Sequence, residues 1–199
     1  MERYSVLKDK NPREIVLLRG SGCKWKRCTF CDYHLDYCLD EEDNYNLNAQ
    51  VLSKVTGIYN KLEVINSGSF CDLDNKTMDL IIKTCEEKNI STVHFECHYI
   101  QHKEVPALNE KFKEHNINVR IKTGVETFDG DYRENVMKKG FGKSTPEKIR
   151  TYADEVCLLF GLTGQTESSM KNDIETGLKY FDRVCVNIMN DNTCLLYTS

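Results

Sequence analysis

The sequence predicts an α/β fold, specifically a partial (β/α)6 TIM-like barrel of parallel strands. Two observations carry this prediction. Six apolar segments with strand character recur along the 199 residues, and a helix-like segment separates each from the next. An alternation of this length is typical of parallel strands joined by right-handed crossovers. The length fits one domain, which we assign to residues 1–193.

Each element is identified by its apolar pattern and its end signals. The predicted strands cover residues 14–20, 62–68, 92–100, 117–127, 155–162 and 183–189. The predicted helices cover residues 45–60, 73–88, 104–115, 143–152 and 166–181. The fourth helix shows the clearest start, because Ser144 is placed as a cap ahead of Pro146 and Glu147.

The last six residues, CLLYTS (194–199), stand apart from this pattern. They match what the end of a common sequencing-library adapter would encode in one frame. We therefore interpret them as a non-native tail and leave them out of the fold. On this interpretation the natural protein continues past the sixth strand.

Composition narrows the class of protein. The net charge is −4, and the cations are scattered, which favours a small-molecule substrate over a large nucleic-acid surface. No segment is apolar enough to span a bilayer, and the first residues lack the apolar core of a signal peptide. We expect a cytoplasmic protein with no membrane partner. Its ten cysteines are then better metal ligands or core residues than disulfide partners.

Three cysteines follow the first strand in the pattern C-x4-C-x2-C: Cys23, Cys28 and Cys31. A structural zinc site would need a fourth ligand, from His34 or Cys38. A core role conflicts with the polar KWKR segment between the first two. The third interpretation is a loop that holds a [4Fe–4S] cluster with one iron left open. The position after a strand, at the mouth where (β/α) barrels keep their chemistry, favours the cluster.

The cysteine loop resembles that of the radical SAM superfamily. The usual spacing there is C-x3-C-x2-C with an aromatic residue before the third cysteine. Phe30 supplies the aromatic residue, and the first gap is one residue longer than usual. The resemblance implies a [4Fe–4S] cluster that cleaves S-adenosylmethionine (SAM) reductively, and a reducing partner of the flavodoxin or ferredoxin type.

Three further motifs at strand ends are similar to superfamily motifs and imply contacts with SAM. NSGSFCD, with Gly68, Ser69 and Phe70, stands where the amino end of SAM is bound. GVET ends the fourth strand and offers Glu126 to the methionine or ribose. GLTGQTE resembles the adenine-contacting motif; Leu162, Gly164 and Glu167 match it, and Phe160 replaces its first glycine.

The combination of LLRGSGCKWKRCTFCDYHLD with NSGSF resembles one small group, the queuine lyases. That resemblance implies cleavage of queuine at the C–N bond to its cyclopentenediol, which yields 7-aminomethyl-7-deazaguanine for queuosine salvage. NSGSF also resembles the radical SAM partner of archaeosine synthesis. A radical SAM enzyme that modifies a base in tRNA is therefore the first alternative, and a non-enzymatic zinc module is the second.

Strand alternation indicates which side chains face the barrel interior. Glu96 and His98 share the polar row of the third strand, and Glu126 lies in that of the fourth. These three are the catalytic candidates, although carboxylates here also form structural ion pairs, such as Glu96 with Arg120 or Glu126 with Lys122. A carboxylate can accept both N–H groups of a guanine edge. The substrate-binding candidates are Tyr33, His34, Asp36 and Glu96.

Overall fold

The computed structural model describes residues 2–190, 192 and 194, so the predicted tail lies outside the described residues except for Cys194. The chain forms two compact units. The first contains residues up to 24 together with 34–96 and 103–120, and the second contains 25–33, 97–102 and the chain from 121 onward. The strands follow one another in the order β1 to β7, and β5 (Asn118–Glu126) contributes to both units.

The first unit is built on a parallel sheet with one antiparallel strand at its edge. Strands β2 (Arg13–Leu17), β3 (Lys61–Ile65) and β4 (Thr92–Glu96) pair in parallel, as predicted. Strand β1 (Tyr4–Leu7) pairs antiparallel with β2 and was not predicted. Its four residues are too few for a period-of-two pattern to be recognised in the sequence.

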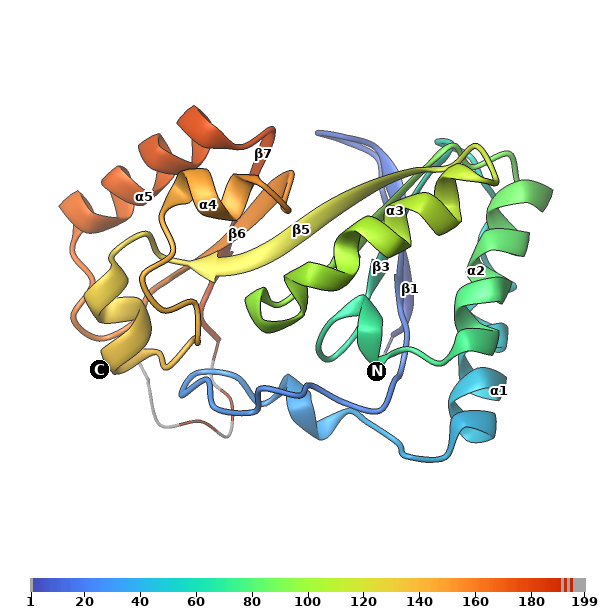
Figure 1. The fold of residues 1–199 in the computed structure, drawn as a ribbon, viewed down its shortest axis with the longest axis horizontal. Helices are drawn as coiled ribbons and strands as arrows, with labels where there is room; N and C mark the ends of the chain where they lie inside the picture. The colour runs from blue at the N-terminus through green and yellow to red at the C-terminus, as the bar shows by residue number, and fades with distance from the viewer. Residues whose placement is uncertain (1, 191, 193, 195–199) are drawn as a thin grey trace. The chain divides into compact units, whose positions relative to one another are not determined.

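Three helices belong to this unit: α1 (Glu41–Leu52), α2 (Asn75–Glu87) and α3 (Val105–Lys113) (Figure 1). The predicted bounds of the first, 45–60, were wrong. The Asp40 side chain accepts a hydrogen bond from the Asp43 N–H and starts α1 earlier. The segment after Leu52 turns instead of continuing, with Gly57 and Asn60 in the left-handed region.

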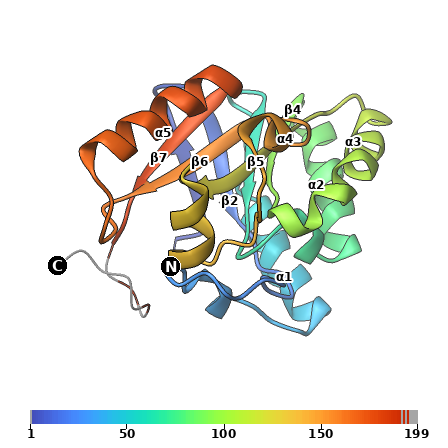
Figure 2. The same ribbon diagram turned by 60° about the vertical axis from the view of Figure 1, so that its left-hand side comes forward.

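The second unit contains the parallel strands β5, β6 (Glu155–Phe160) and β7 (Arg183–Ile188) with helices α4 (Pro146–Arg150) and α5 (Glu167–Tyr180). Figure 2 shows α5 beside β6 and β7. The cap of α4 is Thr145, not Ser144, because the Thr145 hydroxyl accepts from the Lys148 N–H. A π-helix at Tyr132–Val136 was not predicted.

Short 3₁₀ turns connect several of these elements. They cover Tyr33–Leu35, Phe70–Asp72 and Tyr99–Glu104. None of the helices in the described part of the chain combines the length and the apolarity that crossing a bilayer requires.

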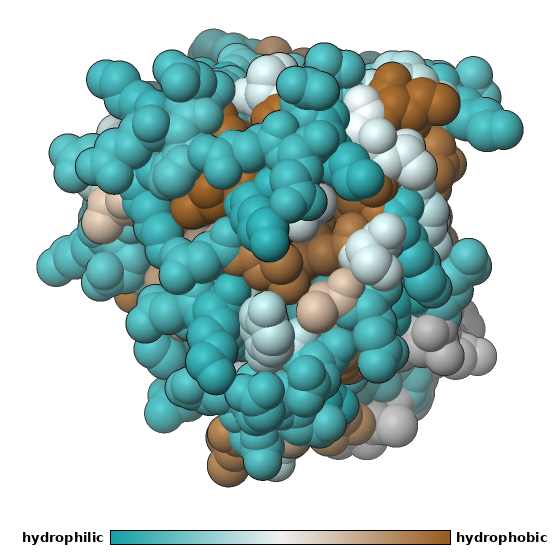
Figure 3. All heavy atoms as spheres, turned by 90° about the vertical axis from the view of Figure 1, so that its right-hand side faces the viewer, coloured by the Kyte–Doolittle hydropathy of each residue, from teal (hydrophilic) through white to brown (hydrophobic). Residues whose placement is uncertain are grey.

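Strand alternation separates the apolar core from the polar rows, as predicted. In the first unit Phe95 on β4 packs edge-on against Phe112 of α3, with ring centroids 5.2 Å apart. In the second unit Ile121, Thr123 and Val125 are buried, and Thr123 Oγ1 accepts from the buried Tyr152 hydroxyl. Figure 3 shows that the face on the side of α1 and α2 is mostly hydrophilic, with apolar side chains between polar ones.

The carboxylate of Glu14 on β2 is fully buried and links three segments of the first unit through hydrogen bonds. It accepts hydrogen bonds of 2.7 Å from the Tyr4 hydroxyl and from the backbone N–H groups of Thr56 and Gly57. Burial alone raises the pKa of Glu14, but these donors outweigh it and bring the pKa below its usual 4.5. The ionised form is therefore the one that stabilises the fold.

We predict that Glu14→Gln lowers the free energy of unfolding at pH 7 by about 2 kcal/mol, because charged hydrogen bonds are replaced by neutral ones. A carboxylate with a lowered pKa contributes stability above the unfolded pKa and loses it as pH falls through the folded pKa. The difference between variant and wild type should be full above pH 4.5 and shrink below it. Urea unfolding at several pH values measures this, with the exposed Glu87→Ala as control. An unchanged difference at low pH would contradict the assignment.

Candidate active site

The predicted site residues lie at the carboxyl ends of the parallel strands in both units. In the first unit, Cys23 follows β2, Gly68 and Ser69 follow β3, and the half-buried Glu96 is the last residue of β4. In the second unit, Glu126 ends β5 and the motif from Gly161 to Gly164 follows β6. In each unit, these strand ends are where barrels of this class carry their chemistry.

The turn after β3 packs against the cysteine loop of the first unit. A Cβ atom on Gly68 would overlap the Asp72 carboxylate and come within 2.9 Å of the Cys23 Cα. Asp72 in turn accepts from the Ser69 N–H at 2.8 Å. Glycine at position 68 therefore lets the turn after β3 approach the backbone of Cys23 closely, and this contact fixes the position of Cys23. The Phe70 ring packs on Phe95 at 6.2 Å.

The loop after the cysteines is held in the first unit by Asp36. Its carboxylate forms an ion pair of 2.7 Å with Arg3, and its backbone oxygen accepts from the Ser67 hydroxyl at 2.5 Å. His34 is half-buried on the same loop, while Tyr33, which belongs to the second unit, is 74% exposed. Of the substrate-binding candidates, Asp36 therefore has a structural partner that the sequence analysis did not identify.

Cys28 and Cys31 lie half-buried on an apolar floor in the second unit. The floor consists of Phe30, Met137, Leu159 and Leu162, all buried. Leu162 is held there because its N–H donates to Gln165 Oε1 at 2.9 Å, in a turn where Gly161 and Gly164 adopt positive φ. Two of the predicted SAM-binding residues, Phe30 within the cysteine loop and Leu162 after β6, thus belong to the same buried cluster. Glu167 begins α5.

Glu126 is placed by an irregularity at the end of β5. The pairing with β6 shifts register between Gly124 and Glu126, and Glu126 adopts φ 66°, a left-handed conformation that is rare outside glycine. A side chain on Gly124 would overlap the Glu126 carboxylate. The backbone therefore turns this carboxylate to a place that a regular strand would not reach.

The partner of Glu126 is Lys139, which the sequence analysis missed. Its Nζ lies 2.8 Å from Glu126 Oε1, and both side chains are buried. Burial lowers the pKa of Lys139, but the Glu126 carboxylate and the thiols of Cys28 and Cys31 outweigh it, so the pKa lies above its usual 10.5. Lys139 is a cation beside two of the cysteines.

His98 is held between aromatic rings. It stacks on Trp25 with ring centroids 5.8 Å apart and meets Phe141 edge-on at 5.7 Å. Its Nε2 bonds the Lys139 carbonyl at 2.9 Å, and its Nδ1 accepts from the Ile100 N–H at 3.3 Å. Burial, followed by the charge of Lys139, lowers the pKa of His98 to about 4. His98 is therefore neutral near pH 7 and orients the segment that carries Lys139.

The other cysteines behave as ordinary side chains. Cys38, the alternative fourth zinc ligand, lies 3.6 Å from an Asp43 oxygen. Burial raises the pKa of Cys71 to about 11 and that of Cys85 to about 12, so both remain thiols. Within the described residues, no three His, Cys, Asp or Glu side chains converge to hold a single metal ion.

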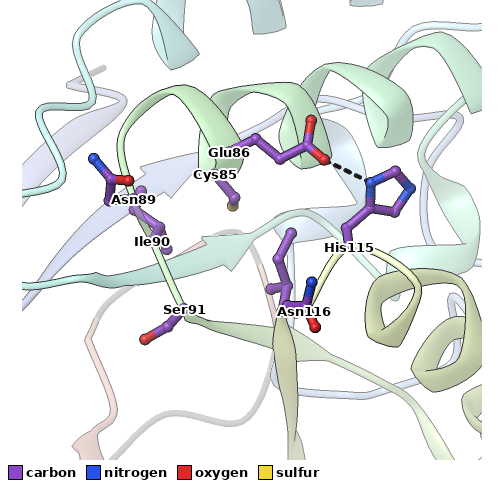
Figure 4. Close-up of a pocket in the computed structure, with 8 residues that line it drawn as sticks. Cys85, Glu86, Asn89, Ile90, Ser91, His115 and Asn116 are labelled. Carbon is purple, nitrogen blue, oxygen red and sulfur yellow. Dashed lines mark hydrogen bonds and ion pairs between the residues drawn. The ribbon is translucent and has the colours of Figure 1, made fainter.

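A hollow in the first unit lies at the opposite ends of the strands. It is lined by the end of α2 and the starts of β4 and β5, where Glu86 pairs with His115 at 2.7 Å (Figure 4). His115 is exposed on the surface. This hollow contains none of the predicted site residues.

The chain is similar to a queuine lyase from Clostridium spiroforme, whose solved structure contains bound SAM and queuine. The TM-score is 0.95, 43% of residues are identical, and the match covers 100% of this chain and 85% of that one. The chain belongs to the queuine lyase family. No protein-family model and no curated protein sequence matches it.

Family membership confirms three predictions. The fold is a partial (β/α)6 TIM-like barrel, the protein is an enzyme of the radical SAM class, and the cofactors of that class are a [4Fe–4S] cluster and SAM. The alternative of a non-enzymatic zinc module was wrong. The described residues fit a cluster, because Cys28 and Cys31 lie on an apolar floor beside a buried cation, which suits thiolate anions.

The packing of Gly68 leads to a direct test. We predict that Gly68→Ala lowers the free energy of unfolding by about 2 kcal/mol, because the added methyl forces apart Asp72 and the Cys23 backbone. It should also reduce the iron bound after anaerobic reconstitution. Urea unfolding and iron analysis provide the two measurements.

Gly130→Ala is the matched control, because a Cβ there meets nothing within 4 Å. It should leave stability and iron content unchanged. Equal behaviour of the two variants would show that the Gly68 turn does not position Cys23.

Proposed function

We propose that this enzyme cleaves free queuine at the C–N bond to its cyclopentenediol and releases 7-aminomethyl-7-deazaguanine for queuosine salvage. The observation that carries the proposal is the full-length similarity to a queuine lyase, at 43% identity and a TM-score of 0.95. The cysteine loop and the strand-end motifs support the radical SAM part of this proposal, because they resemble motifs of that superfamily in the same order along the chain.

The cluster ligands in this proposal are Cys23, Cys28 and Cys31. Three thiolates leave one iron open to a chelating small molecule. When bound, the cluster and SAM supply the 5′-deoxyadenosyl radical that removes a hydrogen atom from the diol ring beside the secondary amine. The apolar floor under Cys28 and Cys31 excludes water from this chemistry. A flavodoxin or ferredoxin would supply the electron.

The residues proposed to hold SAM come from both units. In the first unit, Gly68, Ser69 and Phe70 form the turn after β3, where Ser69 is completely buried. In the second unit, Phe30, Leu162 and Gly164 border the cysteine loop and the turn after β6. Glu126 is the last member of the set, and its carboxylate lies 2.8 Å from the Lys139 ammonium group.

The proposed anchor for the deazaguanine is Glu96 at the end of β4. A carboxylate accepts two N–H groups of a guanine edge, a match that rejects analogues lacking those groups. Asp36 is a weaker anchor, because Arg3 already holds one of its oxygens. His34 and Tyr33 complete the set on the loop that follows the cysteines, and the exposure of Tyr33 suits a residue that meets the substrate on entry.

His98 enters the proposal as a positioning residue. Its Nε2–H donates to the Lys139 carbonyl and its Nδ1 accepts from the Ile100 N–H, and with a pKa of about 4 the ring is neutral near pH 7. We propose a cytoplasmic location, because the ten cysteines are better placed as metal ligands or core residues than as disulfide partners.

The experiment is a side-by-side assay on free queuine and on tRNA that carries queuosine. Anaerobically reconstituted, reduced enzyme with SAM should convert free queuine to 7-aminomethyl-7-deazaguanine and form 5′-deoxyadenosine, with little product from the tRNA. Glu96→Gln should weaken queuine binding about tenfold or more and keep the iron content, because one strong acceptor is lost. Chromatography of the deazaguanine products and a binding titration measure these effects.

Two outcomes would count against the proposal. Cleavage on tRNA alone would move the protein to the alternative class of tRNA-modifying radical SAM enzymes. Formation of 5′-deoxyadenosine without any deazaguanine product from either substrate would remove queuine as the substrate.

A further inference from the structure

We propose that Lys139 is a positioning residue for the iron–sulfur cluster, and that its buried ammonium group makes the cluster easier to reduce. The inference rests on the proposed function, because it requires a cluster on the cysteine loop. It concerns only residues of the second unit, namely Cys28, Phe30, Cys31, Glu126, His98 and Lys139. None of the sequence motifs includes Lys139.

The side chain of Lys139 is fixed beside the cysteines. Its Nζ is 2.8 Å from the Glu126 carboxylate and 5.3 Å from the centroid of the Phe30 ring, which stands between Cys28 and Cys31 in the sequence. Cys28 and Cys31 pack against the buried cluster to which Phe30 belongs. An ammonium held over an aromatic face and next to a carboxylate stays charged in spite of burial.

The backbone of Lys139 is tied to the cysteine loop on both sides. Before it, the Thr29 N–H donates to the Met137 carbonyl at 3.1 Å, and the Thr29 hydroxyl donates to the Val136 carbonyl at 2.8 Å. The Trp25 indole N–H donates to the Lys138 carbonyl at 2.7 Å. After it, Gly140 takes φ 78° directly against the Trp25 ring, a place that no side chain could share.

The carboxylate that pairs with Lys139 is held at a conformational cost. Glu126 occupies a left-handed backbone conformation at a register shift, and Gly124 leaves the space for its carboxylate. Strain of this kind persists where the surrounding structure over-determines it, and it concentrates at functional sites. A pair that served stability alone would not need this geometry, because buried ion pairs are often no more stabilising than apolar side chains.

A cation in this place has a consequence for electron transfer. Reduction adds a negative charge to a cluster that already carries thiolate ligands, and a fixed positive charge nearby in a low-dielectric interior stabilises the reduced form. The charge is buried, so salt screens it weakly. Lys139 therefore favours the state that must form before SAM is cleaved.

The test compares two variants that differ only in the ammonium group. Glu126→Gln keeps Lys139 and removes its carboxylate partner, while the double variant Glu126→Gln with Lys139→Met removes both charges without leaving a buried ion unpaired. Anaerobic redox titration followed by EPR gives the midpoint potential of each reconstituted protein. The cluster of the double variant should be about tenfold harder to reduce than that of Glu126→Gln. For one electron this is a shift of the midpoint potential by about 59 mV toward negative values.

Lys138→Met is the matched control, because it removes the same charge from the preceding residue, which is exposed. Lys138→Met should change the midpoint potential of the wild type by only a small fraction of that shift. Lys139→Arg keeps the positive charge and should also have a midpoint potential near that of the wild type. Equal potentials for the double variant and Glu126→Gln, with iron bound in both, would overturn the inference and leave the proposed function intact. Failure of the wild type to bind a cluster would overturn both.

Discussion

The ion pair between Glu126 and Lys139 is the interaction on which the organisation of the second unit depends. It joins the end of β5 to the segment after the π-helix, at 2.8 Å and out of solvent. That segment is tied through Trp25 and Thr29 to the cysteine loop, and through His98 to the turn after β4. A buried pair of this kind is strongly disfavoured when one partner is lost. Because both partners must stay in place, the pair constrains where Cys28 and Cys31 can lie.

The same constraint determines the surroundings of His98, for which the sequence predicted a catalytic role. The predicted strand 92–100 ends at Glu96, so His98 lies in the turn that follows β4 and strand alternation does not determine what its side chain meets. Trp25 and Phe141 enclose the ring, and the charge of Lys139 further lowers its pKa to about 4. A histidine enclosed in this way orients its neighbours and does not exchange protons near neutral pH.

The sequence predicted the parallel β/α order because apolar strands and helical segments alternate visibly, and it predicted the cysteine loop because three cysteines stand in a motif. It did not predict β1, whose four residues carry too little pattern, nor the early start of α1 at its Asp40 cap. Lys139 was missed because Lys138 and Lys139 are identical in type, and only the fold buries one and exposes the other. The pairing of Glu126 with it depends on a register shift and a positive φ, neither of which the residue types indicate.

The account stands on a cluster held by Cys23, Cys28 and Cys31, so metal analysis of the anaerobically reconstituted protein tests it most directly. Iron, sulfide and zinc should be measured together, with EPR of the reduced protein before and after addition of SAM. The account predicts about four irons and four sulfides per chain and an EPR spectrum that SAM changes, because one iron is open to it. Stoichiometric zinc without iron, or a reduced cluster whose spectrum SAM leaves unaltered, would contradict it.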